Sequence, residues 1–110
     1  MSTIVQTPNA EAIAAWDGPL YDRFLQFRQI VTDGLGAHGE RALRLHPPGR
    51  GERVLDVGCG FGDTTQGLAA LVGPDGEAVG LDAAARFIDT ARQEADQADI
   101  DNARFEVADA

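Results

Sequence analysis

The stretch VLDVGCGFGDTT, residues 54–65, carries the clearest structural pattern of this chain. A short run of branched apolar residues is followed by glycines at alternate positions, Gly58, Gly60 and Gly62, and then by a helical pattern. Glycine permits positive φ and lets a ligand approach the main chain, and the following helix would point its N-terminal N–H groups at that ligand. An acid, Asp56, lies within the run just ahead of the turn. The stretch therefore predicts a strand, a ligand-binding turn and a helix.

The same alternation of strand and helix continues to the end of the chain. Strands are expected at 53–58, 77–82 and 104–109, and helices at 63–73 and 84–98. We expect Asp63 or Thr64 to cap the first of these helices. Two successive right-handed βαβ units predict an α/β, Rossmann-like parallel sheet with helices on both faces and strand order 3-2-1. The first strand is apolar on both faces, which is typical of a strand that is covered and flanked.

The region upstream of the first strand is helical in pattern. Residues 9–16 read as a short helix with Asn9 as its N-cap. Apolar residues at helical spacing follow until about Leu45, with an interruption expected at the glycines between them. The sequence thus divides into an N-terminal helical cap, residues 1–46, and a half-domain, residues 50–110, which we expect to continue beyond the chain end.

Composition narrows the classes of partner. The 110 residues carry a formal net charge of −9 and a pI near 4.4, which argues against a nucleic-acid or anionic-membrane surface. One cysteine excludes an internal disulfide, and two isolated histidines make no metal site. No apolar run approaches the roughly 20 residues of a membrane span, and no secretory signal opens the chain. We therefore expect a cytoplasmic protein with no nucleic acid, no membrane and no metal.

Acidic residues are expected at the carboxyl ends of all the predicted strands. Asp56, Asp82 and Asp109 would meet at one edge of the sheet, where ligands of such folds bind. A dinucleotide would need G-x-G-x-x-G, but the spacing here is G-x-G-x-G and Asp63 replaces the third glycine. Asp56 and Asp63 would also repel a pyrophosphate. S-adenosylmethionine has no phosphate, and its sulfonium and ammonium groups favour nearby carboxylates.

The run from residue 54 to 92 resembles the cofactor-binding half of class I S-adenosylmethionine-dependent methyltransferases. VLDVGCGFG is similar to the first motif of that family, GLDAA to its acidic second motif and VADA to its third. WDGPLYDRF, upstream, resembles the N-terminal cap of some members. The resemblance covers about residues 50–110.

The resemblance implies a role for each residue around the methionine part of the cofactor. Asp56 would meet the ammonium group, directly or through water. Gly58, Cys59 and Gly60 would line the methionine moiety with backbone atoms. Gly62 would let the following helix pack closely.

The resemblance also implies roles around the nucleoside. Asp82 would accept hydrogen bonds from both ribose hydroxyls, and a carboxylate suits a diol because such bonds are charge-assisted. Ala83 would lie beside the adenine. Asp109 would accept a bond from the adenine amino group, with Ala108 and Ala110 alongside.

The implied function is methyl transfer from S-adenosylmethionine to a small-molecule acceptor, with S-adenosylhomocysteine as product. No catalytic residue is identified, because the acceptor-shaping residues of the family mostly follow a fourth strand. We therefore expect the 110 residues to be inactive on their own. Two alternatives stay open: a non-catalytic nucleoside- or cofactor-binding module, and an NAD-binding oxidoreductase domain.

Overall fold

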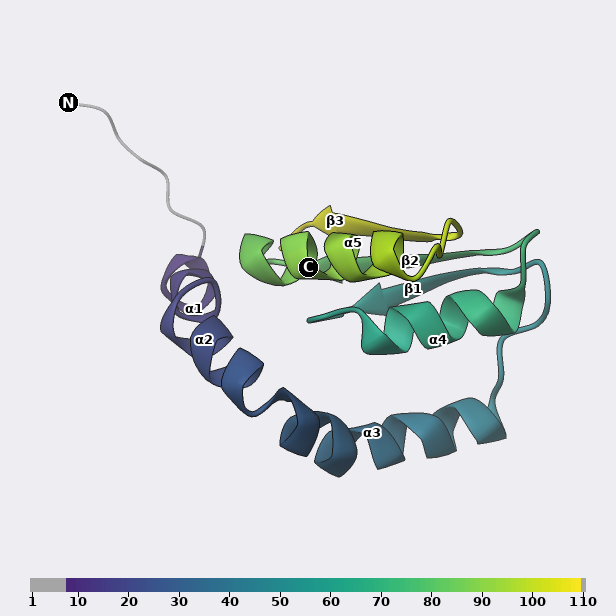
Figure 1. Ribbon diagram of the computed structural model, residues 1–110, viewed down its shortest axis with the longest axis horizontal. Coiled ribbons are helices and arrows are strands. Elements are labelled where there is room, and N and C mark those ends of the chain that lie inside the picture. Colours follow the sequence, from purple (N-terminus) through teal and green to yellow (C-terminus); the bar gives the residue numbers. More distant parts are fainter. Residues whose placement is uncertain (1–7, 110) are drawn as a thin grey trace.

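The computed structural model describes residues 8–109, without the side chains of residues 31–38 (Figure 1). The N-terminal part is helical, with α1 (Ala10–Trp16), α2 (Pro19–Gln26) and α3 (Arg28–Leu45). The rest alternates: β1 (Arg53–Val57), α4 (Asp63–Val72), β2 (Glu77–Asp82), α5 (Ala85–Gln97) and β3 (Ala103–Val107). The order of elements is the one that the sequence predicts.

The three strands form one parallel sheet in the order β1-β2-β3. This is the predicted order 3-2-1 read from the opposite edge, and the predicted α/β, Rossmann-like fold is confirmed. In the register, Val54 lies beside Ala78 and Ala78 beside Ala103, so these three side chains share one face of the sheet. The strand arrows point toward α1 and α2, which places these two helices at the carboxyl edge of the sheet (Figure 1).

The two crossover helices pack on that same face. Leu68 and Ala69 of α4 form a buried cluster with Ala78, and Ala103 packs against this cluster and against the one around α5. The expectation of helices on both faces therefore does not describe this part of the chain. The reason is topological: two right-handed crossovers that wind in one direction leave both helices on one side, and only a reversal of winding places a helix on the other.

The opposite face of the sheet is open at β1. Leu55 and Val57 are each 60% exposed, although the sequence predicts a covered strand. Within residues 8–109, β1 pairs with β2 alone, so its outer edge has no strand partner there.

The helical cap is joined to α5 and the glycine turn through aromatic side chains. Tyr21 of α2 is buried, its ring lies 5.0 Å from that of Phe87 and 5.8 Å from that of Phe61, and its hydroxyl lies 2.6 Å from Oγ1 of Thr90. Phe87 belongs to α5, and Phe61 to the turn before α4. The cap is thus part of the same packed body as the carboxyl edge of the sheet.

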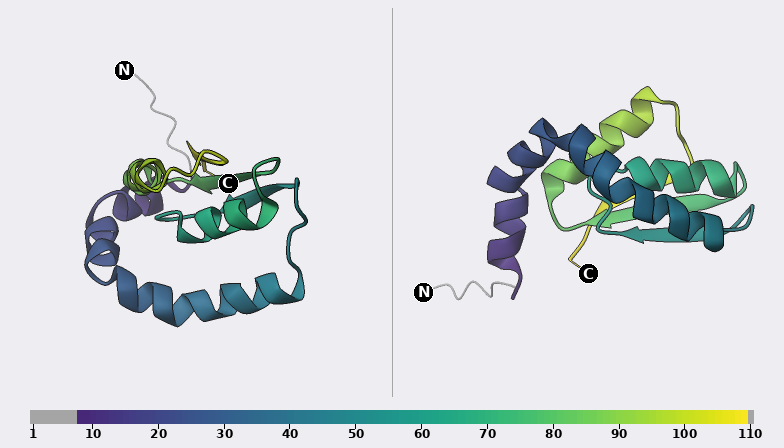
Figure 2. Two further views of the ribbon diagram at one scale, coloured as in Figure 1. Left: turned by 45° about the vertical axis from the view of Figure 1, so that its right-hand side comes forward. Right: turned by 90° about the horizontal axis from the view of Figure 1, so that it is seen from below.

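The third helix runs alongside α4 (Figure 2). The expected glycine interruption is wrong: α3 continues from Arg28 to Leu45, and the break lies before it, at Phe27. An interior glycine costs a helix only about 1 kcal/mol, which the surrounding turns can absorb. No helix in the described part of the chain has the length and apolar character needed to cross a membrane.

Candidate functional site

The glycine turn and the ends of β2 and β3 meet at the carboxyl edge of the sheet. The backbone N–H groups of Gly58 and Cys59 both donate to the carbonyl of Leu81, at 2.8 and 2.9 Å, and so hold the turn against the end of β2. A hollow of about 200 Å³ lies beside it. Its lining includes residues predicted to bind the cofactor, Gly58, Asp82, Ala83, Ala108 and Asp109, together with Val57 and Leu81.

The turn depends on backbone conformations that favour glycine. Gly58, Gly60 and Gly62 have φ of +72°, +55° and +85°. Gly62 occupies the N-cap position of α4 in the left-handed region, so neither Asp63 nor Thr64 caps this helix as the sequence suggests. A Cβ on Gly62 would lie only 2.8 Å from Phe105, so this glycine faces the core. Gly60, by contrast, has its nearest contact at 3.9 Å, on Phe87.

Asp82 connects the turn to the start of α5. One carboxylate oxygen accepts from the N–H of Gly60 at 3.0 Å, and the other accepts from the N–H of Ala84 at 2.9 Å. Because an ionised carboxylate offers about four lone-pair sites, both oxygens can still accept from hydroxyl groups of a ligand. Asp82 therefore shapes the site and also faces the hollow.

Asp56 lies half-buried behind the turn. The hydroxyl of Thr65 donates to its carboxylate at 2.7 Å. Burial raises the pKa of Asp56 above its ordinary value, and the Thr65 hydrogen bond partly offsets that rise. Thr65 is 0% exposed, and the sequence did not indicate it as a candidate site residue. The sequence feature that could indicate Thr65 is a polar residue in the first turn of the helix that follows Asp56.

Cys59 is unsuited to act as a nucleophile. Burial raises the pKa of its thiol to about 12, with further contributions from the charges of Asp82 and Asp56. Since the thiolate is the reactive form, a thiol in this state is inert near neutral pH. Its place between two glycines agrees with a backbone role in the turn.

Asp109 lies just beyond β3, and the helical cap reaches it. The side-chain amide of Asn9 donates to both oxygens of Asp109, at 2.9 and 3.2 Å. Asn9 holds the N-cap position of α1, but its side chain makes no capping bond there, contrary to expectation. Ala110, the last predicted site residue, lies outside the described residues. The structure thus adds Asn9 to the surroundings of the predicted adenine site.

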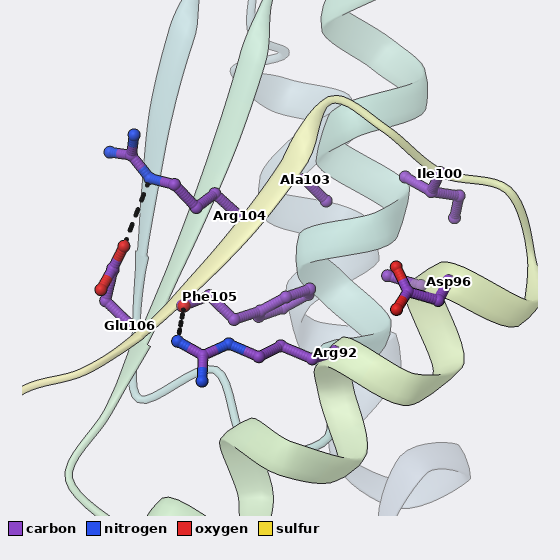
Figure 3. A pocket seen from close by; sticks show the side chains of 8 residues that line it. Arg92, Asp96, Ile100, Ala103, Arg104, Phe105 and Glu106 are labelled. Atoms are coloured by element: carbon purple, nitrogen blue, oxygen red, sulfur yellow. Dashed lines mark hydrogen bonds and ion pairs between the residues drawn. The ribbon is translucent and has the colours of Figure 1, made fainter.

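A second hollow, of about 310 Å³, lies between α5 and β3 (Figure 3). Arg92 crosses it and donates to the carbonyl of Phe105 at 2.7 Å, on the outer edge of the sheet. None of the predicted cofactor residues lines it. It therefore forms no part of the candidate site.

Known proteins with similar sequences are methyltransferases. The chain is 38% identical over 105 residues to a 23S rRNA (uracil(1939)-C(5))-methyltransferase of Stenotrophomonas maltophilia, covering 93% of this chain and 22% of that protein. It is 40% identical over 72 residues to aklanonic acid methyltransferase of a Streptomyces species, covering 66% of this chain and 33% of that protein. The chain thus spans about a fifth to a third of the length of these relatives.

These relatives correct one expectation. Several are named as 23S rRNA methyltransferases, so the exclusion of nucleic acid as a partner is wrong. The net charge of −9 belongs to 110 residues, whereas the relatives are several times longer. A charge argument about one segment says nothing of contacts made by other parts of a protein.

The family assignment rests on the part of the chain that contains the site. A TehB-like S-adenosylmethionine-dependent methyltransferase of Corynebacterium glutamicum has a similar structure, with a TM-score of 0.57 and 28% identity, covering 84% of this chain and 47% of that one. Residues 48–110, more than half of the chain, match the family model described as a methyltransferase domain. The chain therefore belongs to the class I S-adenosylmethionine-dependent methyltransferases.

Proposed function

We propose that the carboxyl edge of this sheet binds S-adenosylmethionine with its methionine part along the glycine turn and its adenosine in the hollow at the ends of β1, β2 and β3. The observation that carries this assignment is the position of Asp82, which contacts the turn through Gly60 and also lines the hollow. A carboxylate at this point is placed to accept from ribose hydroxyls while it keeps the turn in shape.

The residues present fit a cationic ligand. Asp56 and Asp82 form no ion pair with any basic side chain that the structure describes, in residues 8–30 and 39–109. Since a half-buried carboxylate is costly without a positive partner, an ammonium group beside Asp56 would stabilise its charged form. A pyrophosphate in the same place would be repelled.

When bound, the cofactor would supply an electrophilic methyl group on a positively charged sulfur. The part of the chain described here binds and orients. The backbone of Gly58 and Gly60 admits the methionine moiety, and Asp82 and Asp109 are placed to fix the nucleoside. These roles follow from the proposed binding mode.

We expect cofactor binding to weaken as the pH falls, because of Asp56. Its raised pKa means that the folded, ligand-free protein holds this proton more tightly than the unfolded chain does, so ionised Asp56 disfavours folding at neutral pH. A bound ammonium group would favour the ionised form of Asp56 instead. Binding at a pH near the pKa of Asp56 should therefore release a proton from its carboxyl group. Calorimetric titration with S-adenosylhomocysteine from about pH 7 down to about pH 4 measures the effect. In Asp56→Asn, affinity should be lower and this pH dependence absent; an unchanged pH dependence would place the titrating group elsewhere.

The proposed acceptor of the whole protein is an RNA base. The support is the set of relatives named for the C5 position of a uracil in 23S rRNA. The test is transfer of a labelled methyl group from S-adenosylmethionine to unmodified 23S rRNA by the intact protein, with tRNA as a comparison. Label in the rRNA is the expected result. Methyl transfer to other acceptors and none to rRNA would overturn the proposed RNA acceptor. It would not contradict the proposed cofactor site.

The division into a helical cap, residues 1–46, and a cofactor-binding half-domain, residues 50–110, is part of the same proposal. The family match begins at residue 48, between the end of α3 at Leu45 and the start of β1 at Arg53. The cytoplasmic location stays a prediction.

A further inference from the structure

We propose that Arg28, at the start of α3, is a positioning residue for the cofactor turn and acts through Phe61 and Asp63. The inference rests on the proposed function, in which this turn holds the cofactor. It assigns to the helical cap a direct effect on cofactor affinity.

Arg28 joins three helices through its guanidinium group. Its two Nη atoms donate to the two carboxylate oxygens of Glu94 on α5, each at 2.7 Å, and one of them also donates to Asp63 on α4 at 2.8 Å. The side chain is only 25% exposed. The fork-shaped contact with Glu94 is the strongest common arrangement of an arginine with a carboxylate, so it fixes the direction of the guanidinium plane. The Glu94 hydrogen bond raises the pKa of Arg28, while burial acts in the opposite direction.

The guanidinium also packs on the turn itself. Its Cζ lies 4.4 Å from the centroid of the Phe61 ring, a cation–π contact. Phe61 is buried, with its ring 4.8 Å from that of Phe87. Arg28 therefore contacts the residue before Gly62 and the residue after it.

These contacts matter because the turn itself has little intrinsic rigidity. Its glycines have access to many backbone conformations, and this freedom must be restricted before a ligand can be bound by main-chain atoms. Asp82 restrains the turn at Gly60, through the N–H of that residue. Arg28, a side chain of the cap, restrains the turn at Phe61 and Asp63. Without Arg28, the cofactor would have to order this half of the turn on binding.

The experiment compares variants of the intact protein by titration calorimetry with S-adenosylhomocysteine and by urea unfolding. Arg28→Ala should lower the affinity about tenfold or more. Arg28→Lys loses the fork-shaped contact and the planar stacking but keeps the charge. Its affinity for S-adenosylhomocysteine should therefore fall, but by less than that of Arg28→Ala. The matched control is Arg86→Ala. Arg86 likewise joins the cap to α5, through an ion pair with Asp22 at 3.0 Å and a contact with the Tyr21 ring at 4.1 Å. These contacts are one step further from the turn, because Tyr21, whose ring lies 5.8 Å from that of Phe61, stands between Arg86 and the turn.

The affinity of Arg86→Ala should stay within about twofold of the wild type. Its stability should fall by less than that of Arg28→Ala, because the Arg86 side chain is 45% exposed and pairs with a single carboxylate. Hydrogen exchange at the Gly60 and Gly62 amides should quicken in Arg28→Ala and not in Arg86→Ala. If Arg28→Ala does not fold, Asp63→Asn provides the second test and should weaken binding by several-fold.

Wild-type affinity in a folded Arg28→Ala variant, or equal losses in Arg28→Ala and Arg86→Ala, would overturn the inference. If Arg28→Ala does not fold, wild-type affinity in the Asp63→Asn variant would overturn the inference. Failure of the wild-type protein to bind S-adenosylhomocysteine would instead overturn the proposed cofactor site.

Discussion

Replacing Gly62 by alanine should lower the free energy of unfolding by about 2–5 kcal/mol. Two separate effects add at this position. The φ of +85° is unfavourable for any residue with a Cβ, and the new methyl group would lie 2.8 Å from Cε1 of Phe105 and 3.1 Å from Cβ of Ala91. Both neighbours are buried, so relief would require displacement of β3 or α5. Urea unfolding followed by circular dichroism measures the change.

The matched control is Gly58→Ala. Gly58 also has positive φ, +72°, but a Cβ there would meet nothing within 4 Å. Only the backbone effect remains, so we expect a loss of about 1–2 kcal/mol. Equal losses in the two variants would show that the close packing of Gly62 against Phe105 does not contribute to stability.

Replacing Asp82 by alanine should reduce the affinity for S-adenosylhomocysteine at least tenfold. Under the proposed binding mode the variant loses charge-assisted hydrogen bonds to the ribose, each worth about 1.5–3 kcal/mol. It also frees the N–H groups of Gly60 and Ala84, which loosens the turn. Calorimetric titration of the folded variant measures the loss.

Asp75→Ala is the control for charge. Asp75 is exposed in the turn between α4 and β2, so its removal changes the net charge by the same amount without touching the site. Its affinity should equal that of the wild type. Wild-type affinity in folded Asp82→Ala would mean that this acid does not bind the ribose.

Local patterns in the sequence were sufficient to predict most of the fold. The glycine run, the strand ahead of it and the helix after it are read from neighbours in sequence, and the winding rule then sets the strand order. The same rule brings Asp56, Asp82 and Asp109 to one edge, because parallel strands end together there. The face on which both helices lie follows from the direction of winding, which the prediction of helices on both faces did not take into account.

The remaining features of the candidate site depend on contacts between distant segments. Arg28 meets Glu94 and Asp63 only because the cap folds back over α4 and α5, and no spacing in the sequence encodes that approach. Asn9 reaches Asp109 across 100 positions of sequence for the same reason. The exclusion of nucleic acid as a partner was wrong because it rested on the net charge of these 110 residues alone.

The proposed function requires that the glycine turn and the acids at this edge bind a cationic nucleoside cofactor. The most direct test is calorimetric titration of the intact protein with S-adenosylmethionine, S-adenosylhomocysteine and NAD under the same conditions. We predict saturable one-to-one binding of the first two and none of NAD, because Asp56 and Asp63 border the place that a pyrophosphate would occupy. Binding of NAD, with no binding of S-adenosylmethionine or S-adenosylhomocysteine, would contradict the account.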